Sequence, residues 1–410
     1  MNLNIRPVFS ALLRNRTGAI LVAMQIAIAL AVLVNAVYIV KQRVDRIGRP
    51  TGMDVENIFA ISSSGFAQGY DHRATLRDDL AYLRSVPGVV DAVATTSVPL
   101  SGGGNGSFLS PRPGGMHSGF TAQQGDGNYF EIDEHGLQTL GVRLIAGRNF
   151  RPDEIAPAPL SLAHTEFAPS VIITQAYARY LFPDGNPLGR TVYDYLSRPA
   201  RIIGIIDHMH GAWPTVDHPD RVYFLPRMAY GPRATYLVRT EPGELNRVMA
   251  QVEQHMGTSN SDRVINWVRT LSSFKADTYM SDRNMGTFLV TVTSLLLAIA
   301  SLGIFGLATF NVNTRTKQIG TRRAVGARRR DIVAYFMVEN WLITTAGIVV
   351  GCAMALGVGY WLSHQYAMPR LDLYFLVGGV LGLWGLGLLA AWQPARRAAT
   401  ISPAVATRTV

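Results

Sequence analysis

Cysteine and lysine are nearly absent from this sequence. The single cysteine, Cys352, lies in an apolar run, so the long polar segment 41–283 is expected to fold without internal disulfides. Lysine occurs only at Lys41, Lys275 and Lys317, and none of the three follows a glycine. The motif G-x-x-x-x-G-K-[ST], which holds nucleotide phosphates, is therefore missing, and residues 1–410 are not expected to bind or hydrolyse ATP by that route.

Charged residues are also scarce. Only 16% of the residues are charged whereas 48% are hydrophobic, which is too apolar for an ordinary soluble enzyme. The formal net charge of +10 could indicate nucleic-acid binding. However, no aromatic-interleaved basic patch or base-reading motif accompanies it, and much of the excess lies beside apolar runs. Nucleic acid is therefore not an expected partner.

Four apolar runs have the length of about 20 residues that a membrane-spanning helix needs. They cover residues 18–40, 284–310, 340–363 and 373–392. The first is too long for a signal-peptide core and lacks a small-residue cleavage site, so we interpret it as a retained anchor. No run carries a charged residue in its middle, since Glu339 lies only at the edge of the third. This argues against a proton-driven transporter or an ion pump.

Basic residues predict the orientation of these spans. Arg6, Arg14 and Arg16 precede the first span, and Arg396, Arg397 and Arg408 follow the fourth. A third group, described below, lies in the loop 311–339. Short loops rich in Lys and Arg resist translocation, so segments 1–17, 311–339 and 393–410 are predicted to be cytoplasmic, with 41–283 and 364–372 outside. Four basic residues just outside the first span oppose this, but long domains translocate largely regardless of charge.

Glycines recur in the spans at helix-packing intervals. The candidates are Gly303, Gly306, Gly347, Gly351, Gly378 and Gly382, of which the last four form two G-x-x-x-G pairs. Small residues at this spacing let helix backbones approach closely in lipid. Packing within one bundle and dimerisation would both use them, and the spacing does not decide between the two.

The segment 41–283 alternates strand-like and helix-like patterns. Strand, helix and strand are predicted first at residues 57–62, 73–85 and 89–95, and again at 234–239, 244–255 and 263–268. Two β-α-β units at the two ends of one domain suggest two halves that pack together. Between them, a Gly-rich irregular insert runs from residue 99 to 170, and further strands are predicted at 171–173, 202–206 and 222–225.

Catalytic and metal-binding patterns in this segment are weak. His208 and His210, with Asp217 and His218 nearby, come nearest to a metal site. Histidines in a loop are more often surface residues, and no partner that would orient them can be named, so no metal is expected. Ser101 lacks the G-x-S-x-G turn of a nucleophile. No catalytic residue is assigned, and the chain by itself is not expected to be an enzyme.

The loop Arg315–Asp331 is the most informative segment. Its basic residues are Arg315, Lys317, Arg322, Arg323, Arg328, Arg329 and Arg330. A stop-transfer charge cluster would explain the charge alone. Yet Gly326 lies where a helix C-terminus is expected, and Asp331 lies near the start of the next helix. Together with the apolar Ile319, Ala324 and Val325, the pattern predicts a small cationic docking element.

These features resemble permeases of the MacB/FtsX type, the mechanotransmission class (type VII) of the ABC transporter superfamily. The loop follows the family pattern, with Gln318 in place of the usual Glu. The matching segments are Arg315–Ile332 for the loop, Pro394–Pro403 for the tail, and Asn128–Phe130, Leu140–Leu144, Gly147–Phe150 and Pro187–Arg190 in the external segment. The resemblance covers nearly the whole chain.

The resemblance implies four membrane helices with a large mixed α/β extracytoplasmic domain between the first two. That domain would comprise a porter-like β-α-β pair, with halves at about 55–98 and 171–270, and an inserted lobe at about 99–170. The loop would dock on a separate ATPase through Ile319, Gly320, Arg322, Arg323, Ala324, Val325, Gly326 and Ala327. ATP and Mg would be bound by that partner, and no cofactor by this chain.

The function implied is that of a permease subunit in the bacterial inner membrane. It would transmit ATP-driven conformational change to a periplasmic domain for efflux of antibiotics, peptides or similar molecules. Expected partners are the ATPase, a second permease copy or paralogue, a periplasmic membrane fusion protein and the lipid bilayer. Alternatives are an FtsX-like regulator of a cell-wall hydrolase and Lol-type lipoprotein extraction.

Overall fold

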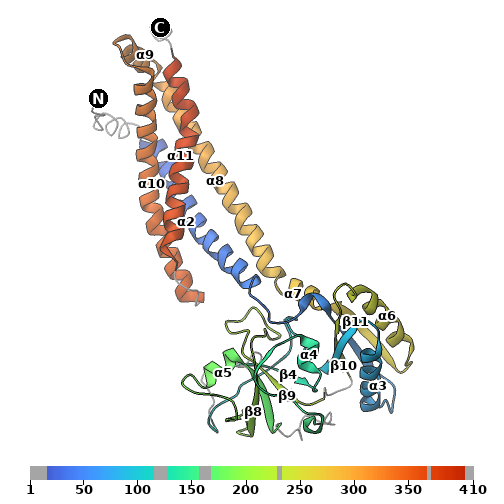
Figure 1. The fold of residues 1–410 in the computed structure, drawn as a ribbon. Helices are drawn as coiled ribbons and strands as arrows, with labels where there is room; N and C mark the ends of the chain where they lie inside the picture. The colour runs from blue at the N-terminus through green and yellow to red at the C-terminus, as the bar shows by residue number, and fades with distance from the viewer. Residues whose placement is uncertain (1–15, 115–126, 157–167, 229–232, 367–370, 402–410) are drawn as a thin grey trace. The chain divides into compact units, whose positions relative to one another are not determined.

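A computed structural model describes residues 16–114, 127–156, 168–228, 233–366 and 371–401 (Figure 1). The chain forms two compact units, Gly48–Ser281 and a unit made of Met1–Ile47 with Asp282–Val410. The first is called here the external domain and the second the membrane unit. Most of the predicted N-terminal segment 1–17, part of the loop 364–372, parts of the insert and the tail beyond Ile401 lie outside the described residues.

The membrane unit contains the four predicted spans. They are α2 (Arg16–Ile47), α8 (Met280–Thr314), α10 (Arg329–Tyr366) and α11 (Leu373–Thr400), all long and apolar enough to cross a membrane. The helices run beyond the apolar runs that predicted them. α10 begins at Arg329 rather than near 340, and α11 continues past 392 to Thr400, because helical hydrogen bonding persists in the polar ends. The predicted loop 311–339 is therefore largely helical.

Helix α2 packs against the other three helices. Its Ile26, Leu30 and Val34 are buried in one apolar cluster with Ile304, Ile343, Ile348 and Leu383 from α8, α10 and α11. In contrast, α8 and α11 expose large apolar side chains, such as Leu302 and Leu389. Such a surface is what a helix presents to lipid or to another membrane helix.

An ion pair joins two of these helices near the ends that connect to the external domain. Arg43 of α2 bonds to Asp282 of α8, whose side chain is only 8% exposed. Lys41 pairs with Asp45 one turn away. Two of the basic residues that opposed the predicted orientation are therefore neutralised by partners within the chain.

The external domain contains a four-stranded antiparallel sheet. Its strands are β1 (Ile58–Gly65), β2 (Val89–Thr95), β10 (Arg233–Thr240) and β11 (Arg263–Thr270), in the order β11-β1-β10-β2. Helix α3 (His72–Ser85) joins β1 to β2, and α6 (Leu245–Thr258) joins β10 to β11. The two predicted β-α-β units are confirmed. Because β1 lies between β10 and β11, the two units interleave within one sheet.

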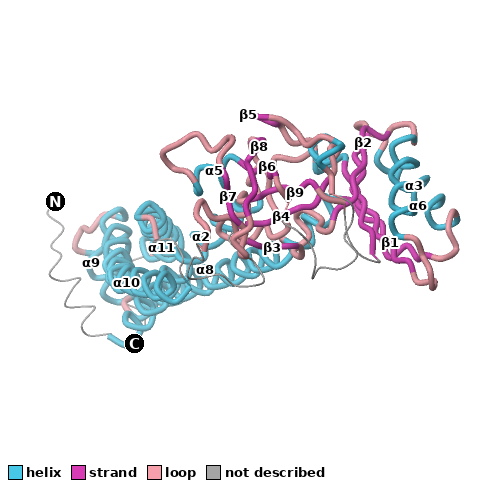
Figure 2. The backbone as a smooth tube through the Cα atoms, turned by 90° about the horizontal axis from the view of Figure 1, so that it is seen from below, coloured by secondary structure: helices cyan, strands magenta, loops and turns pink. Residues whose placement is uncertain are grey.

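Alternation of side chains along β1 gives this sheet two buried faces. Phe59 and Ile61 point into a cluster with residues of α3 and α6, which lie side by side on one face (Figure 2). Ile58 and Ala60 belong to a different cluster on the opposite face. The opposite face is covered by the second lobe of the external domain.

The second lobe is built on a seven-stranded mixed sheet. Its strands are β3 (Asn105–Ser107), β4 (Gly127–Ile132), β5 (Leu144–Gly147), β6 (Ser170–Thr174), β7 (Thr191–Tyr193), β8 (Pro199–Ile206) and β9 (Val222–Pro226). The order is β3-β4-β9-β6-β8-β5, with β7 paired to β8. Short elements complete the domain: η1 (Val55–Asn57), α4 (Gly136–Leu140), η2 (Pro152–Glu154), α5 (Gln175–Leu181) and α7 (Leu271–Thr278).

The predicted boundary of the inserted lobe at residue 170 is wrong. Strands β6, β8 and β9 belong to the seven-stranded sheet and not to the porter-like half assigned to 171–270. Strand β4 pairs with β9 in parallel, with Asn128 opposite Val222, so the lobe closes on itself over a long sequence separation. Strand periodicity does not reveal such a partner. The lobe therefore reaches β9, and the second porter-like unit begins at β10.

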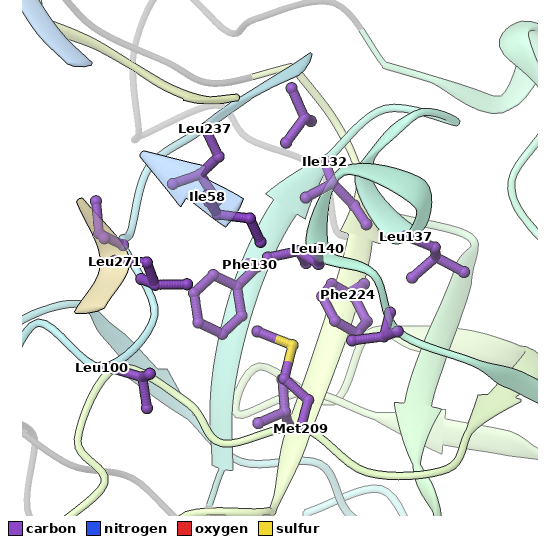
Figure 3. Close-up of a cluster of buried hydrophobic side chains, with 14 of the residues drawn as sticks. Ile58, Leu100, Phe130, Ile132, Leu137, Leu140, Met209, Phe224, Leu237 and Leu271 are labelled. Atoms are coloured by element: carbon purple, nitrogen blue, oxygen red, sulfur yellow. The ribbon is translucent and has the colours of Figure 1, made fainter. Parts of the chain in front are cut away.

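A single apolar core joins the two lobes (Figure 3). Ile58 and Leu237 of the four-stranded sheet pack with Phe130 and Phe224 of the seven-stranded sheet and with Leu271 of α7. Arg84 of α3 adds an ion pair across the lobes, 2.6 Å from Asp133. The two lobes therefore share both an apolar core and an ion pair.

Candidate functional site

The basic loop folds into a short helix, α9 (Thr316–Ala324), between α8 and α10. It lies at the end of the bundle where α11 also ends (Figure 1). α9 stops in a Schellman motif: the N–H of Ala327 donates to Arg322 O at 3.0 Å, and that of Gly326 to Arg323 O at 3.1 Å. Gly326 has φ +104°, which favours glycine. The predicted role of Gly326 as a helix terminator is confirmed.

The start of α10 is capped by Asp331. Its carboxylate accepts a hydrogen bond at 3.0 Å from the N–H of Arg328, the residue before the helix. The position is the third of the helix, where an acidic side chain satisfies an otherwise unpaired donor and interacts favourably with the helix dipole. Gly326 and Asp331 thus fix the sharp turn from α9 to α10.

The apolar residues of the loop divide between two surfaces. Ile319 is 4% exposed and packs with Val312, Ile332, Phe336, Ala395, Ala398 and Ala399 from the ends of α8, α10 and α11. Gly320 is buried beside it, whereas Ala324 and Gly326 are exposed and Val325 is 84% exposed. Ile319, Ala324 and Val325 were grouped in the predicted docking element, but Ile319 does not share an apolar surface with the other two. At 100° per residue, positions five and six apart lie on different helix faces.

Two arginines of the predicted site contact the bundle. Arg322 lies over the ring of Tyr335 at 5.1 Å, a cation–π distance. Arg323 donates to the carbonyl oxygen of Ile401, just after α11. Ala327 packs at the edge of the same apolar cluster as Ile319. The predicted residues therefore form one structural element, of which Ala324, Val325 and Gly326 are the outward tip.

A buried ion pair, which the sequence did not predict, fastens the start of α9. Arg315 donates to Glu339 of α10 at 2.9 Å and to the Tyr335 hydroxyl at 3.3 Å. The Glu339 side chain is 3% exposed, and that of Arg315 16%. Glu339 was noted only as an acidic residue at the edge of an apolar run. Its position at the edge of an apolar run could have predicted the ion pair, because a carboxylate buried there needs a cationic partner.

The packing glycines fall into two groups. A Cβ on Gly347 would lie 2.5 Å from Ala23 O, one on Gly351 2.9 Å from Ala27 O, and one on Gly303 2.4 Å from the Gln25 side chain. These three let α10 and α8 approach α2 within one chain. Nothing lies within 4 Å of the corresponding positions at Gly306, Gly378 and Gly382. Of the two uses, packing within the bundle accounts only for the first group.

His208 and His210 lie far from this loop in the sequence, between β8 and β9 of the external domain. They border a cavity of about 340 Å³ with Arg49, Pro50 and residues 217–220. Among the described residues, no three His, Cys, Asp or Glu side chains are arranged to hold a metal ion.

The four spans, the α/β domain inserted after the first and the basic helix α9 define a multi-pass membrane permease. Residues 17–255 match the MacB-like periplasmic core domain, and residues 290–403 match the FtsX-like permease C-terminal domain. The chain belongs to the MacB/FtsX-type permeases of the ABC transporter superfamily.

Curated relatives agree with this assignment. The macrolide export ATP-binding/permease protein MacB of Neisseria meningitidis (serogroup A) is 24% identical over 67% of this chain. The chain spans only 42% of the length of that relative. The uncharacterized ABC transporter permease YknZ of Bacillus subtilis is 23% identical and is matched over 99% of this chain and 98% of its own length.

Among solved structures, the periplasmic region of MacB from Actinobacillus actinomycetemcomitans is similar. It is 16% identical, with a TM-score of 0.33, and the match covers 55% of this chain and 94% of that one. The extracellular domain of YknZ gives 17% identity and a TM-score of 0.29, with coverage of 50% and 98%.

Proposed function

We propose that this chain is a permease subunit that couples ATP hydrolysis by another subunit to movement of its external domain. A separate ATP-binding subunit docks on α9 and the turn after it, with Val325 at the centre of the contact. Closure of two such subunits shifts α8, and α8 carries the displacement to the external domain. No substrate needs to cross the bilayer in this mechanism.

The observation that supports this proposal is that one side of α9 is bonded to the membrane helices while its C-terminal tip is exposed. Its inner side is fixed to three membrane helices by Ile319, by the Arg315–Glu339 ion pair and by the Arg323–Ile401 hydrogen bond. Its tip presents Val325 with 84% of the side chain exposed. Exposed basic side chains around the tip, among them Lys317 and Arg328, suit a partner with carboxylates. A force on the tip therefore reaches the helices directly.

Efflux is the activity that the relatives favour. The MacB relatives are named for macrolide export, and residues 17–255, which include most of the external domain, match the MacB-like periplasmic core domain. We therefore propose efflux of antibiotics, peptides or similar molecules. The match to the FtsX-like family is confined to residues 290–403, which favours efflux over regulation of a cell-wall hydrolase.

Assembly requires partners on both sides of the membrane. A second permease copy or a paralogue would pack against exposed glycine surfaces, such as that of Gly378 and Gly382 on α11. A periplasmic membrane fusion protein would receive the exported molecule. Affinity purification of the tagged chain from its host's membranes tests the assembly, since an ATP-binding subunit should co-purify.

The topology can be tested by cysteine labelling in a Cys352→Ala background. Single cysteines replacing Gly103 and Lys275 should react with a membrane-impermeant maleimide in intact cells. Cysteines replacing Arg329 and Arg397 should react only after the membrane is permeabilised, because basic loops remain cytoplasmic. Reaction at position 329 in intact cells would contradict the four-span orientation.

The purified chain alone is expected to hydrolyse no ATP. The sequence lacks the phosphate-binding loop and its lysine, so turnover should appear only when the co-purified subunit is present. A phosphate-release assay on both preparations checks this. Steady turnover by the isolated chain, unchanged after removal of contaminating ATPases, would overturn the assignment as a non-catalytic subunit.

A further inference from the structure

One loop of the external domain meets both connections that lead to the membrane helices. It is the segment Asp207–Pro214 between β8 and β9, called here the joint loop. The first connection is residues 48–53, which follow α2, and the second is α7 with Thr278 and Tyr279, which precede α8. Both connections belong to the same compact unit as the joint loop.

The first connection is bound by two hydrogen bonds. The N–H of His210 donates to Thr51 O at 3.0 Å, and the His208 ring Nε2 lies 2.7 Å from Pro50 O. A carbonyl oxygen only accepts, so Nε2 of His208 carries the proton in this contact. Gly52 has φ +78°, and a Cβ there would lie 2.0 Å from His208 O. The close approach of the two segments therefore needs glycine at this position.

The second connection reaches the same loop. The hydroxyl of Tyr279, which is 2% exposed, donates to Pro214 O at 3.4 Å. Thr278 donates to Leu100 O at 2.7 Å. The segment from Leu100 to Gly102 is in turn bonded to the joint loop, through Leu100 N to Gly211 O at 3.0 Å and Gly102 N to Ala212 O at 2.8 Å.

The joint loop is anchored in the second lobe. The N–H of Ala212 donates to the Asn128 side chain of β4 at 3.0 Å. Met209 is fully buried against Phe130 and Phe224 of the seven-stranded sheet (Figure 3). A displacement of the loop is therefore passed to the lobe through close-packed side chains.

Chain connectivity gives the second lobe only indirect links to the membrane helices. The first connection continues into β1, and β11 leads into α7, so both covalent routes enter the four-stranded sheet. The strands of the second lobe, β3 to β9, have no direct covalent link to a membrane helix. In addition to the shared core, the joint loop bonds this lobe to both connections.

His210 is uncharged, as expected for a residue with a structural role. Burial, reinforced by His208, lowers the pKa of His210 to about 4, although Asp220 opposes the shift. Its ring is therefore neutral at physiological pH and adds no charge to the joint. Arg49 and Pro50 of the first connection also line the adjoining cavity.

We propose that the joint loop transmits displacement of both membrane connections to the second lobe, with His208 as the positioning residue at the first connection. This inference rests on the proposed function. It predicts that loosening the joint loop weakens the response of the second lobe to movement of the membrane helices, while the four-stranded sheet still follows that movement.

The test uses the full chain in its host cells, with Cys352→Ala as background. Single reporter cysteines replace the exposed Ile145 of β5 in the second lobe or the exposed Val264 of β11 in the four-stranded sheet. The rate of reaction with a membrane-impermeant maleimide is measured in energised and ATP-depleted cells. Without a joint variant, both positions should show an ATP-dependent rate.

His208→Ala should reduce the ATP dependence at position 145 and preserve it at position 264. His208→Gln should restore it, because a glutamine amide can still donate to Pro50 O. Tyr279→Phe, which removes the hydrogen bond to Pro214 O, should weaken the response at position 145 and not at position 264. If His208→Ala keeps the full ATP dependence of the reaction rate at both positions, or loses it at both, the proposed role of the joint loop is wrong. Without a joint variant, absence of ATP dependence at both positions would refute the proposed function, whereas absence at position 145 alone would contradict the joint proposal.

Discussion

Val325→Glu is expected to abolish co-purification of the ATP-binding subunit while leaving the permease folded in the membrane. Val325 is 84% exposed in this chain, so its replacement removes little internal packing. Docking would bury the new carboxylate without a partner, which costs about 3–5 kcal/mol, or more than a hundredfold in affinity. Acidic groups on the partner, which the surrounding arginines would attract, would also repel it.

Val325→Leu is the matched control, since it keeps an apolar side chain at the same position and should retain the subunit. Arg329→Ala removes an exposed basic residue outside the tip and should mainly change membrane insertion or expression. All variants are compared at equal membrane levels by quantitative blotting. Full retention of the subunit by Val325→Glu would mean that the loop is only a topogenic charge cluster.

Glu339→Ala is expected to be the most destabilising substitution in the membrane unit. It leaves the guanidinium of Arg315, whose side chain is 16% exposed, without its carboxylate. Breaking a buried ion pair from one side typically costs about 3–5 kcal/mol. Because Arg315 stands at the start of α9, the helix should detach from α10 and dock poorly even though Val325 is unchanged.

Thermal unfolding in detergent measures the stability loss, and limited trypsin cleavage at Arg328–Arg330 reports detachment of α9. Asp45→Ala, which breaks the exposed Lys41–Asp45 pair, should change neither signal. The double variant Arg315→Met with Glu339→Leu should recover much of the stability, since apolar residues can replace a buried pair. An unchanged cleavage pattern in Glu339→Ala would show that the pair does not hold α9.

The sequence predicted the membrane spans and the four-stranded sheet because both depend on local periodicity. Apolar runs located α2, α8, α10 and α11, and alternating or helical patterns located the two β-α-β units. The extent of the second lobe depends instead on strands that pair across long separations, such as β4 with β9. No local pattern in residues 171–225 distinguishes the two sheets.

In the candidate docking site, too, the local features could be predicted from the sequence and the long-range contacts could not. The charge cluster, the terminator Gly326 and the cap Asp331 could be predicted, because each acts within one turn of helix. The direction in which Ile319 points depends on the ends of three helices, and the partner of Arg315 lies 24 residues away. Contacts of that kind follow from packing of the helices and not from spacing alone.

The most direct test of the central claim is photo-crosslinking from position 325 in living cells. A photoreactive phenylalanine replaces Val325 in the tagged full chain, and the same residue at Val264, in the external domain, serves as the control. The account predicts an adduct with an ATP-binding protein from position 325 and none from 264. Its loss when the cells also carry Glu339→Ala would place the contact on a properly fastened α9. A cross-linker at 325 that yields no ATP-binding protein, although the permease is present and active, would contradict the docking role of this loop.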